Sequence, residues 1–170
     1  DSTYNPELFY RLDVKNFGIL HAIDFGIWNH NSNGKAEPDS RSYEKSYIRL
    51  QAQKELKKWV VSGSVQFNYM HDFEPGNKDI QKYIGPTSFS LSLVQIFDTW
   101  IDKGEISLQA TPGGKFSQDW DKGGYQLANS FRLGGIEVVP SFYLQYYRGY
   151  AETLLNYNER VNEFRAGVVF

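Results

Sequence analysis

The chain of 170 residues is long enough for one domain, and its 18 basic and 20 acidic side chains give a net charge of −2. A balance this close to neutral gives no reason to expect a nucleic-acid partner. No apolar run approaches the roughly 18 to 20 residues that a membrane helix requires, and the lack of cysteine is compatible with export to an oxidising compartment.

Polar and apolar side chains alternate repeatedly along the chain, which is the pattern of a β-strand with two different faces. A strand of a membrane-spanning barrel needs only about 9 to 11 residues, and every second side chain faces lipid. In chain order, the alternation predicts strands over residues 7–14, 19–29, 44–52, 59–69, 88–93, 105–110, 125–133, 136–146 and 163–170.

The connections between these strands sort by length. Long ones at 30–41, 71–79, 112–123 and 149–158 alternate with short ones at 16–18, 55–58, 95–103 and 134–135. Such alternation is expected when one end of a barrel faces the exterior and the other faces the periplasm. We therefore predict an all-β protein, an antiparallel transmembrane β-barrel of the outer-membrane type with about nine strands in this chain. A soluble β-barrel binding protein, whose apolar face is its core, is an alternative.

The segment after the second predicted strand carries the residues with catalytic potential. His30 and Ser32 stand two residues apart, so both leave one face if the strand runs through them. An imidazole activates a serine hydroxyl by taking its proton, and it needs a third group that fixes its tautomer. Glu44 returns beside His30 if the residues between them form a loop, and the amide of Gly34 could hold an oxyanion. The alternative is a polar hairpin loop without catalytic function.

The parity of the strands predicts where these side chains point. Glu44 is separated by an even number of positions from the apolar residues of its strand, so all of them lie on one face of the strand. We therefore expect Glu44 to face outward. The apolar residues of the preceding strand lie instead on the parity opposite to His30 and Ser32. We interpret this conflict as a β-bulge near Gly26 that shifts the register. The three candidate residues would then stand on the lipid-facing surface, at the outer leaflet.

The other polar residues suggest structural roles. Charges of both signs recur on the inward parity and predict a polar interior network: Arg49, Arg132, Arg165, Glu105 and Glu163. His21 and His71 have no serine partner, so we expect them to be lumen or loop histidines. Glu152 is also expected to be structural.

Several motifs together resemble those of the outer-membrane phospholipase A family. They are H-N-S-N-G at 30–34, S-R-S-Y-E at 40–44, K-Y-I-G at 82–85 and G-Y-A-E-T-L-L-N-Y-N at 149–158, and the resemblance covers essentially the whole chain. It extends to Phe170, which is similar to the C-terminal assembly signal of bacterial outer-membrane barrels. The resemblance implies calcium-dependent hydrolysis of phospholipid acyl esters in the bacterial outer membrane. A non-enzymatic outer-membrane pore or structural barrel is the second hypothesis.

The resemblance also implies a role for each site residue. His30 would be the base, Ser32 the nucleophile and Gly34 part of the oxyanion site, while Glu44 stands where the family generally has asparagine. Calcium ligands would be the Ser40 side chain and the Lys35 carbonyl, with Glu37 at a second, weaker site. Calcium prefers six to eight oxygen ligands, so water or a second copy of the barrel in a homodimer would supply the remainder.

The resemblance finally implies a longer barrel than this chain provides. The family has twelve strands, whereas the alternation predicts about nine here. We therefore expect residues 1–170 to be a single β-barrel domain that is the C-terminal portion of a longer barrel.

Overall fold

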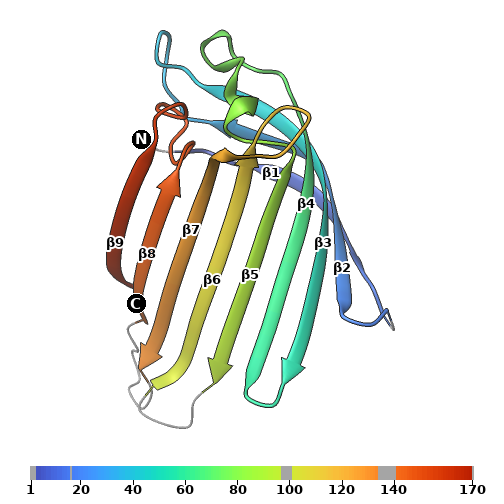
Figure 1. The fold of residues 1–170 in the computed structure, drawn as a ribbon. Helices are drawn as coiled ribbons and strands as arrows, with labels where there is room; N and C mark the ends of the chain where they lie inside the picture. Colours follow the sequence, from blue (N-terminus) through green and yellow to red (C-terminus); the bar gives the residue numbers. More distant parts are fainter. Residues whose placement is uncertain (1–2, 16, 97–100, 134–140, 170) are drawn as a thin grey trace.

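The computed structural model describes residues 3–15, 17–96, 101–133 and 141–169. They form one antiparallel sheet in which every strand pairs with its neighbours in sequence order, so β1 and β9 are its edges within the described residues. Its strands are β1 (Glu7–Asp13), β2 (Leu20–Ser32), β3 (Ser42–Leu56), β4 (Trp59–His71), β5 (Thr87–Ile96), β6 (Ile101–Gly113), β7 (Asp119–Leu133), β8 (Ser141–Gly149) and β9 (Val161–Val169). The predicted antiparallel all-β fold is confirmed (Figure 1).

The long connections gather at one end of the sheet, at the top of Figure 1. We call this the loop end, formed by residues 33–41, 72–86, 114–118 and 150–160. The loop predicted at 71–79 is longer than expected, because it contains two short 3-10 helices, Pro75–Asn77 and Ile80–Lys82. No helix among the described residues is long and apolar enough to cross a membrane.

The prediction of a loop at 112–123 is wrong, because β6 and β7 extend through most of these residues. Its glycines suggested a loop, but they permit close packing of the two strands. A Cβ on Gly123 would lie 2.7 Å from the Cα of Pro112. The short connections predicted at 16–18, 95–103 and 134–135 lie at least partly outside the described residues, as does Phe170.

The two faces of the sheet differ in chemistry. On β3, Tyr43 and Tyr47 are buried while Ile48 and Leu50 are exposed, because alternate residues point to opposite faces. We call the face of Tyr47 the inner face and that of Ile48 the outer face. Exposed apolar residues continue the outer face on other strands: Phe25, Phe67, Leu91, Ile106, Leu108, Leu127, Leu144 and Phe164. An apolar face of this extent fits contact with lipid.

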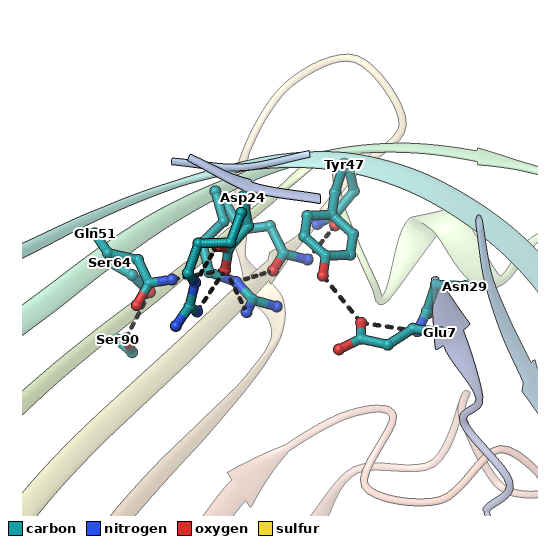
Figure 2. Close-up of polar contacts among 11 residues, drawn as sticks. Glu7, Asp24, Asn29, Tyr47, Gln51, Ser64 and Ser90 are labelled. Atoms are coloured by element: carbon teal, nitrogen blue, oxygen red, sulfur yellow. Dashed lines mark hydrogen bonds and ion pairs between the residues drawn. The ribbon is translucent and has the colours of Figure 1, made fainter. Parts of the chain in front are cut away.

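The inner face is polar, and its charges are paired. Asp24 is fully buried and accepts hydrogen bonds from Arg11 at 2.8 Å, from Arg49 at 3.3 Å and from Gln51 at 2.6 Å (Figure 2). This pairing offsets the cost of removing a carboxylate from water. Alternation along the strands predicts this polar interior, but it gives no sign that Asp24 is its centre.

Three more of the predicted charged residues make polar contacts on the inner face. Arg165 is hydrogen-bonded to Glu163 and Glu152, a contact that fits the structural role expected for Glu152. Glu105 accepts a hydrogen bond from the Ser92 hydroxyl at 2.8 Å. The predicted network is therefore present as separate groups of contacts rather than as one continuous chain.

The apolar core lies at the loop end. Its buried members come from two strands and two loops: Tyr43, Met70, Ile80, Leu154 and Tyr157. The loops 72–86 and 150–160 are also joined by a hydrogen bond from the Tyr157 hydroxyl to Asp79. Because this cluster includes Tyr43, it packs the two loops against the inner face of β3, close to the point where that strand begins.

The predicted bulge in β2 is confirmed. Gly26 pairs with Tyr47 of β3, but the next pair is Asn29 with Lys45, so β2 carries one extra residue between Gly26 and Asn29. The ring of Tyr47 lies against Gly26 so closely that an added Cβ would be 2.2 Å from a ring carbon. Glycine therefore allows the tyrosine ring to cover the bulge.

Candidate active site

The bulge reverses the faces to which successive side chains at the end of β2 point. His30 and Ser32 therefore face outward, and Asn29 and Asn31 are buried on the inner face. His30 stands directly opposite Glu44 in the β2–β3 register. Its Nδ1 lies 3.5 Å from the carboxylate Oε1, and the two side chains are 33% and 26% exposed. The structure therefore brings together the predicted imidazole and carboxylate, in a setting that solvent only partly screens.

A neighbouring tryptophan supports the imidazole. The rings of Trp28 and His30 are stacked, with centroids 6.0 Å apart and planes inclined by 14°. The stacked tryptophan limits movement of the His30 ring at its face, while the contact with Glu44 limits movement at its edge. The spacing of two residues between Trp28 and His30 places both on one face, and this spacing is the only sequence signal for the contact.

Ser32 is held through its backbone by a segment that precedes β1. Tyr4 donates to the Ser32 carbonyl at 2.7 Å, and the Ser32 amide donates to the Tyr4 carbonyl at 3.0 Å. The Ser32 Oγ accepts a hydrogen bond from the Gly34 amide at 3.0 Å. Among the described residues, no hydrogen bond joins this hydroxyl to His30, but both side chains leave the outer face of β2 two residues apart.

One buried asparagine shapes the loop 33–41. The Asn33 side chain donates to the carbonyl of Asp39 at 2.8 Å and accepts from the amides of Arg41 at 3.0 Å and Lys35 at 3.4 Å. These bonds hold the two ends of the loop together beside Ser32. Asparagine is common in turns for this reason, but the sequence alone did not single out Asn33 as the residue that organises the loop.

The three predicted calcium-binding residues lie in this loop. Lys35 and Glu37 are exposed and Ser40 is half-buried. The Ser40 carbonyl accepts a hydrogen bond from the Arg41 guanidinium at 2.7 Å, and the Ser40 hydroxyl is the atom predicted to bind the ion. All the atoms offered are oxygens, which is the donor set that calcium prefers. The chemistry of the loop therefore fits calcium, although it supplies fewer ligands than a complete site needs.

The position of His71 differs from the predicted one, which was in the lumen or in a loop. It is the last residue of β4 and stands opposite Glu44 in the β3–β4 register, on the outer face. The strand extends further than the alternation predicted because Glu44 and Lys45 continue the pairing with β4. Glu44 is therefore flanked by a histidine on each neighbouring strand.

Polar contacts on the inner face support the strand behind the candidate site. Asn31 donates to Asn29 at 2.7 Å, and Asn29 donates to Asn5 at 2.7 Å and to Glu7 at 3.3 Å. The Tyr47 hydroxyl donates to Glu7 at 3.0 Å (Figure 2). These contacts join the N-terminal segment, β1, β2 and β3 directly behind His30.

The antiparallel sheet, its apolar outer face and its long loops at one end define the fold as that of a bacterial outer-membrane barrel protein. The comparison with known families is more specific. The sequence model of the family "Phospholipase A1" matches residues 1–170, and the chain belongs to this family. Its relatives place it in the bacterial outer membrane.

Individual relatives agree with this assignment. Phospholipase A1 of Klebsiella pneumoniae is 33% identical over 176 residues, covering 99% of this chain and 53% of that protein. The structure of outer membrane phospholipase A from Escherichia coli matches with a TM-score of 0.72 at 29% identity, covering 98% of this chain and 60% of that one. The Salmonella typhi outer membrane phospholipase, a dimer with bound calcium, also gives 0.72, at 28% identity and with 98% and 59% covered. This chain spans about half the length of the curated relatives it matches.

Proposed function

We propose that the protein hydrolyses acyl ester bonds of membrane phospholipids. In this proposal Ser32 is the nucleophile, His30 is the general base, and Glu44 orients and charge-stabilises the imidazole. The single observation that carries the proposal is the pairing of His30 with Glu44 on the outer face, next to a serine whose Oγ already contacts the Gly34 amide. Membership of the Phospholipase A1 family supports the same reaction.

The chemistry follows from these positions. Because Glu44 lies at Nδ1 of His30, Nε2 is left to accept the proton of the Ser32 hydroxyl. The Ser32 oxygen then bonds to the ester carbonyl carbon, and the carbonyl oxygen becomes an oxyanion within reach of the Gly34 amide. His30 returns its proton to the departing alkoxide of the lysophospholipid. Water next attacks the acyl-serine and loses a proton to His30. The bond to the Ser32 oxygen then breaks, His30 returns the proton to that oxygen, and the fatty acid leaves.

The position of the site supports a lipid substrate. His30 and Ser32 lie at the loop end of the outer face, above the exposed apolar residues Ile48 and Phe25. Trp28 and Tyr69, at the same level, are 39% and 72% exposed. Such aromatic residues are favoured where lipid headgroups meet the hydrocarbon. An ester of a phospholipid in the outer leaflet would lie at this depth.

We also propose that the reaction depends on calcium and on a homodimer. The Ser40 hydroxyl and the Lys35 carbonyl would hold the ion near Ser32, and Glu37 would contribute to a second site. A cation there supplies positive charge that stabilises the oxyanion. Because these residues are too few for a complete calcium site, a second copy of the protein would supply further oxygens. The calcium-bound dimer of the Salmonella typhi relative supports this proposal.

The decisive experiment measures fatty acid release from phospholipid in mixed micelles, with calcium or with a chelator. We expect Ser32→Ala to abolish the calcium-stimulated rate. Ser64→Ala is the matched control, because Ser64 lies on β4 and its hydroxyl contacts that of Ser90 on β5 at 2.7 Å, away from the proposed chemistry. Full calcium-stimulated activity in Ser32→Ala would exclude this nucleophile. A wild-type protein that conducts ions across bilayers but hydrolyses no lipid would favour a pore instead.

A further inference from the structure

Glu44 lies at the centre of a row of titratable side chains across three strands. It faces His30 on β2 and His71 on β4 in the strand registers. Asp72 follows His71, and their side chains lie 3.0 Å apart, from Nδ1 to Oδ2. Ligand atoms of Glu44, His71 and Asp72 all lie within 4.8 Å of one another. The proposed reaction uses His30 and Glu44 but leaves His71 and Asp72 without a role.

We propose that Glu44, His71 and Asp72 form a binding site for a divalent transition-metal ion of the zinc type, and that this ion inhibits the enzyme by withdrawing Glu44 from His30. The binding site stands on its own geometry. The inhibitory effect rests on the proposed function, because it requires Glu44 to serve the reaction.

The donor atoms favour zinc over calcium. An imidazole nitrogen with two carboxylate oxygens suits zinc, whereas calcium prefers oxygen ligands alone. Zinc binds these atoms at about 2.0 to 2.2 Å, so two ligands of a tetrahedral ion lie about 3.5 Å apart. Rotations that move the side-chain ends by about 1 Å would therefore close the group around an ion. Water can occupy the fourth position of a tetrahedral site.

The group is accessible from water. The side chains of Glu44, His71 and Asp72 are 26%, 30% and 75% exposed, and Asp72 begins the loop 72–86. A dissolved ion can thus reach the group from the loop end without crossing the apolar part of the outer face. The site also differs from the proposed calcium ligands, which lie in the loop 33–41.

Metal binding at this position would act directly on the proposed catalytic residues. A carboxylate bound to zinc donates electron density to the metal, so Glu44 would hold the imidazole of His30 less effectively. The ion would also place positive charge beside His30, which must itself become positive when it accepts the serine proton. Both effects raise the barrier to attack without blocking access to Ser32.

The first experiment measures zinc binding by competition with a chromogenic chelator, using untagged protein in detergent with saturating calcium. We expect one zinc ion per chain, with affinity weakened by at least about tenfold in His71→Gln, since even indirect changes at metal sites cost this much. His21→Gln is the matched control, because His21 is an exposed histidine of the same sheet near the opposite end of β2. Equal zinc affinity in the wild type and in His71→Gln would overturn the site. Circular dichroism checks that both variants are folded.

The second experiment measures phospholipid hydrolysis over the same zinc concentrations. We expect inhibition of the wild type to follow zinc occupancy, and His71→Gln to need at least about tenfold more zinc for the same inhibition. Zinc that binds through His71 without slowing hydrolysis would overturn the inhibitory role. A wild type that is inactive without zinc would instead contradict the proposed function, while the binding measurement would still decide whether the site exists.

Discussion

Tyr4 and Ser32 exchange both of their backbone hydrogen bonds, at 2.7 and 3.0 Å. The bridge lies outside the named strands and fixes the backbone of the proposed nucleophile from the side opposite to β3. The His30 amide is held in the same way, because it donates to the Pro6 carbonyl at 3.0 Å. The N-terminal segment therefore positions the candidate site, even though it contributes none of its proposed catalytic side chains.

The contact between Tyr4 and Gly34 leads to a first prediction. Gly34 has a φ of 67°, and an added Cβ would lie 2.6 Å from the Tyr4 ring. Gly18 has a similar φ of 63° with open space around it. Alanine at either position should cost about 1 kcal/mol of unfolding free energy. Only Gly34→Ala should also slow phospholipid hydrolysis, because the loop must move away from Tyr4. Equal rates in the two variants would contradict this account.

A second prediction concerns Glu44. Glu44→Ala should lower kcat by about 10²-fold or more, because the imidazole of His30 loses the group that orients it and balances its charge. Glu44→Asn should retain more activity, since an amide oxygen still accepts a hydrogen bond from Nδ1. The rates are measured at saturating calcium. A kcat for Glu44→Ala equal to that of the wild type would remove Glu44 from the mechanism.

The bulge provides a third prediction. Gly26→Ala should destabilise the protein and reduce hydrolysis, because the Tyr47 ring lies 2.2 Å from the added Cβ and must leave the bulge. Gly63→Ala is the control, since its Cβ would meet no atom closer than 3.5 Å. Thermal unfolding in micelles and phospholipid hydrolysis are both measured. The prediction fails if the two alanine variants behave alike.

The buried carboxylate of Asp24 provides a fourth prediction. Asp24→Ala leaves Arg11 and Arg49 without their shared partner on the inner face. It should cost about 2 kcal/mol of stability through the lost charged hydrogen bonds, since the arginine side chains are 47% and 29% exposed and stay hydrated. The exposed Asp121 is the matched control, and its alanine variant should stay within about 0.5 kcal/mol of the wild type. Chemical denaturation in micelles measures both values.

A fifth prediction concerns the pH dependence of loop packing. The Tyr157 hydroxyl donates to Asp79 and holds the pKa of that carboxyl below its usual range. The Asp79 carboxylate therefore contributes to loop packing at neutral pH, and this contribution is lost as the pH falls through the lowered pKa. Burial, together with Asp79, raises the pKa of Tyr157 to about 12, so the tyrosine contribution is lost only as the pH rises through that value. Amide hydrogen exchange in the loop 72–86, compared with the intrinsic exchange rate at each pH, should therefore show less protection in acid.

Two variants test the origin of this acid response. Asp79→Asn should remove most of this loss of protection, because an asparagine side chain does not titrate. Tyr157→Phe should weaken the loop packing at neutral pH and also reduce the acid response. An unchanged acid response in Asp79→Asn would assign it to another group.

Much of the fold and part of the site could be predicted from the sequence, for physical reasons. Alternation reports the two faces of a strand directly, so it located the strands and the outward parity of Glu44. The conflict of parity around Gly26 revealed the bulge. A loop between two antiparallel strands brings the residues on either side of it together, so the length of the predicted loop placed Glu44 beside His30.

Other features have no local signal. The Tyr4–Ser32 bridge joins a segment without alternation to a distant strand end, and Asp24 becomes central only through the partners that pairing brings to it. His71 looked isolated because its neighbour Glu44 is far away in sequence. The glycines near residue 123 suggested a loop, whereas they allow close contact between strands.

The single extra residue in β2 decides whether the side chains of His30 and Ser32 face the apolar outer side or the polar inner side of the sheet. Removing one residue between Gly26 and Asn29 would restore even alternation and carry the imidazole and the hydroxyl through the wall into its hydrated interior. The hydrogen-bonded ladder could survive such a deletion almost unchanged. A barrel of this kind could therefore gain or lose a membrane-directed reaction by the insertion or deletion of one codon, without any substitution among its reactive side chains.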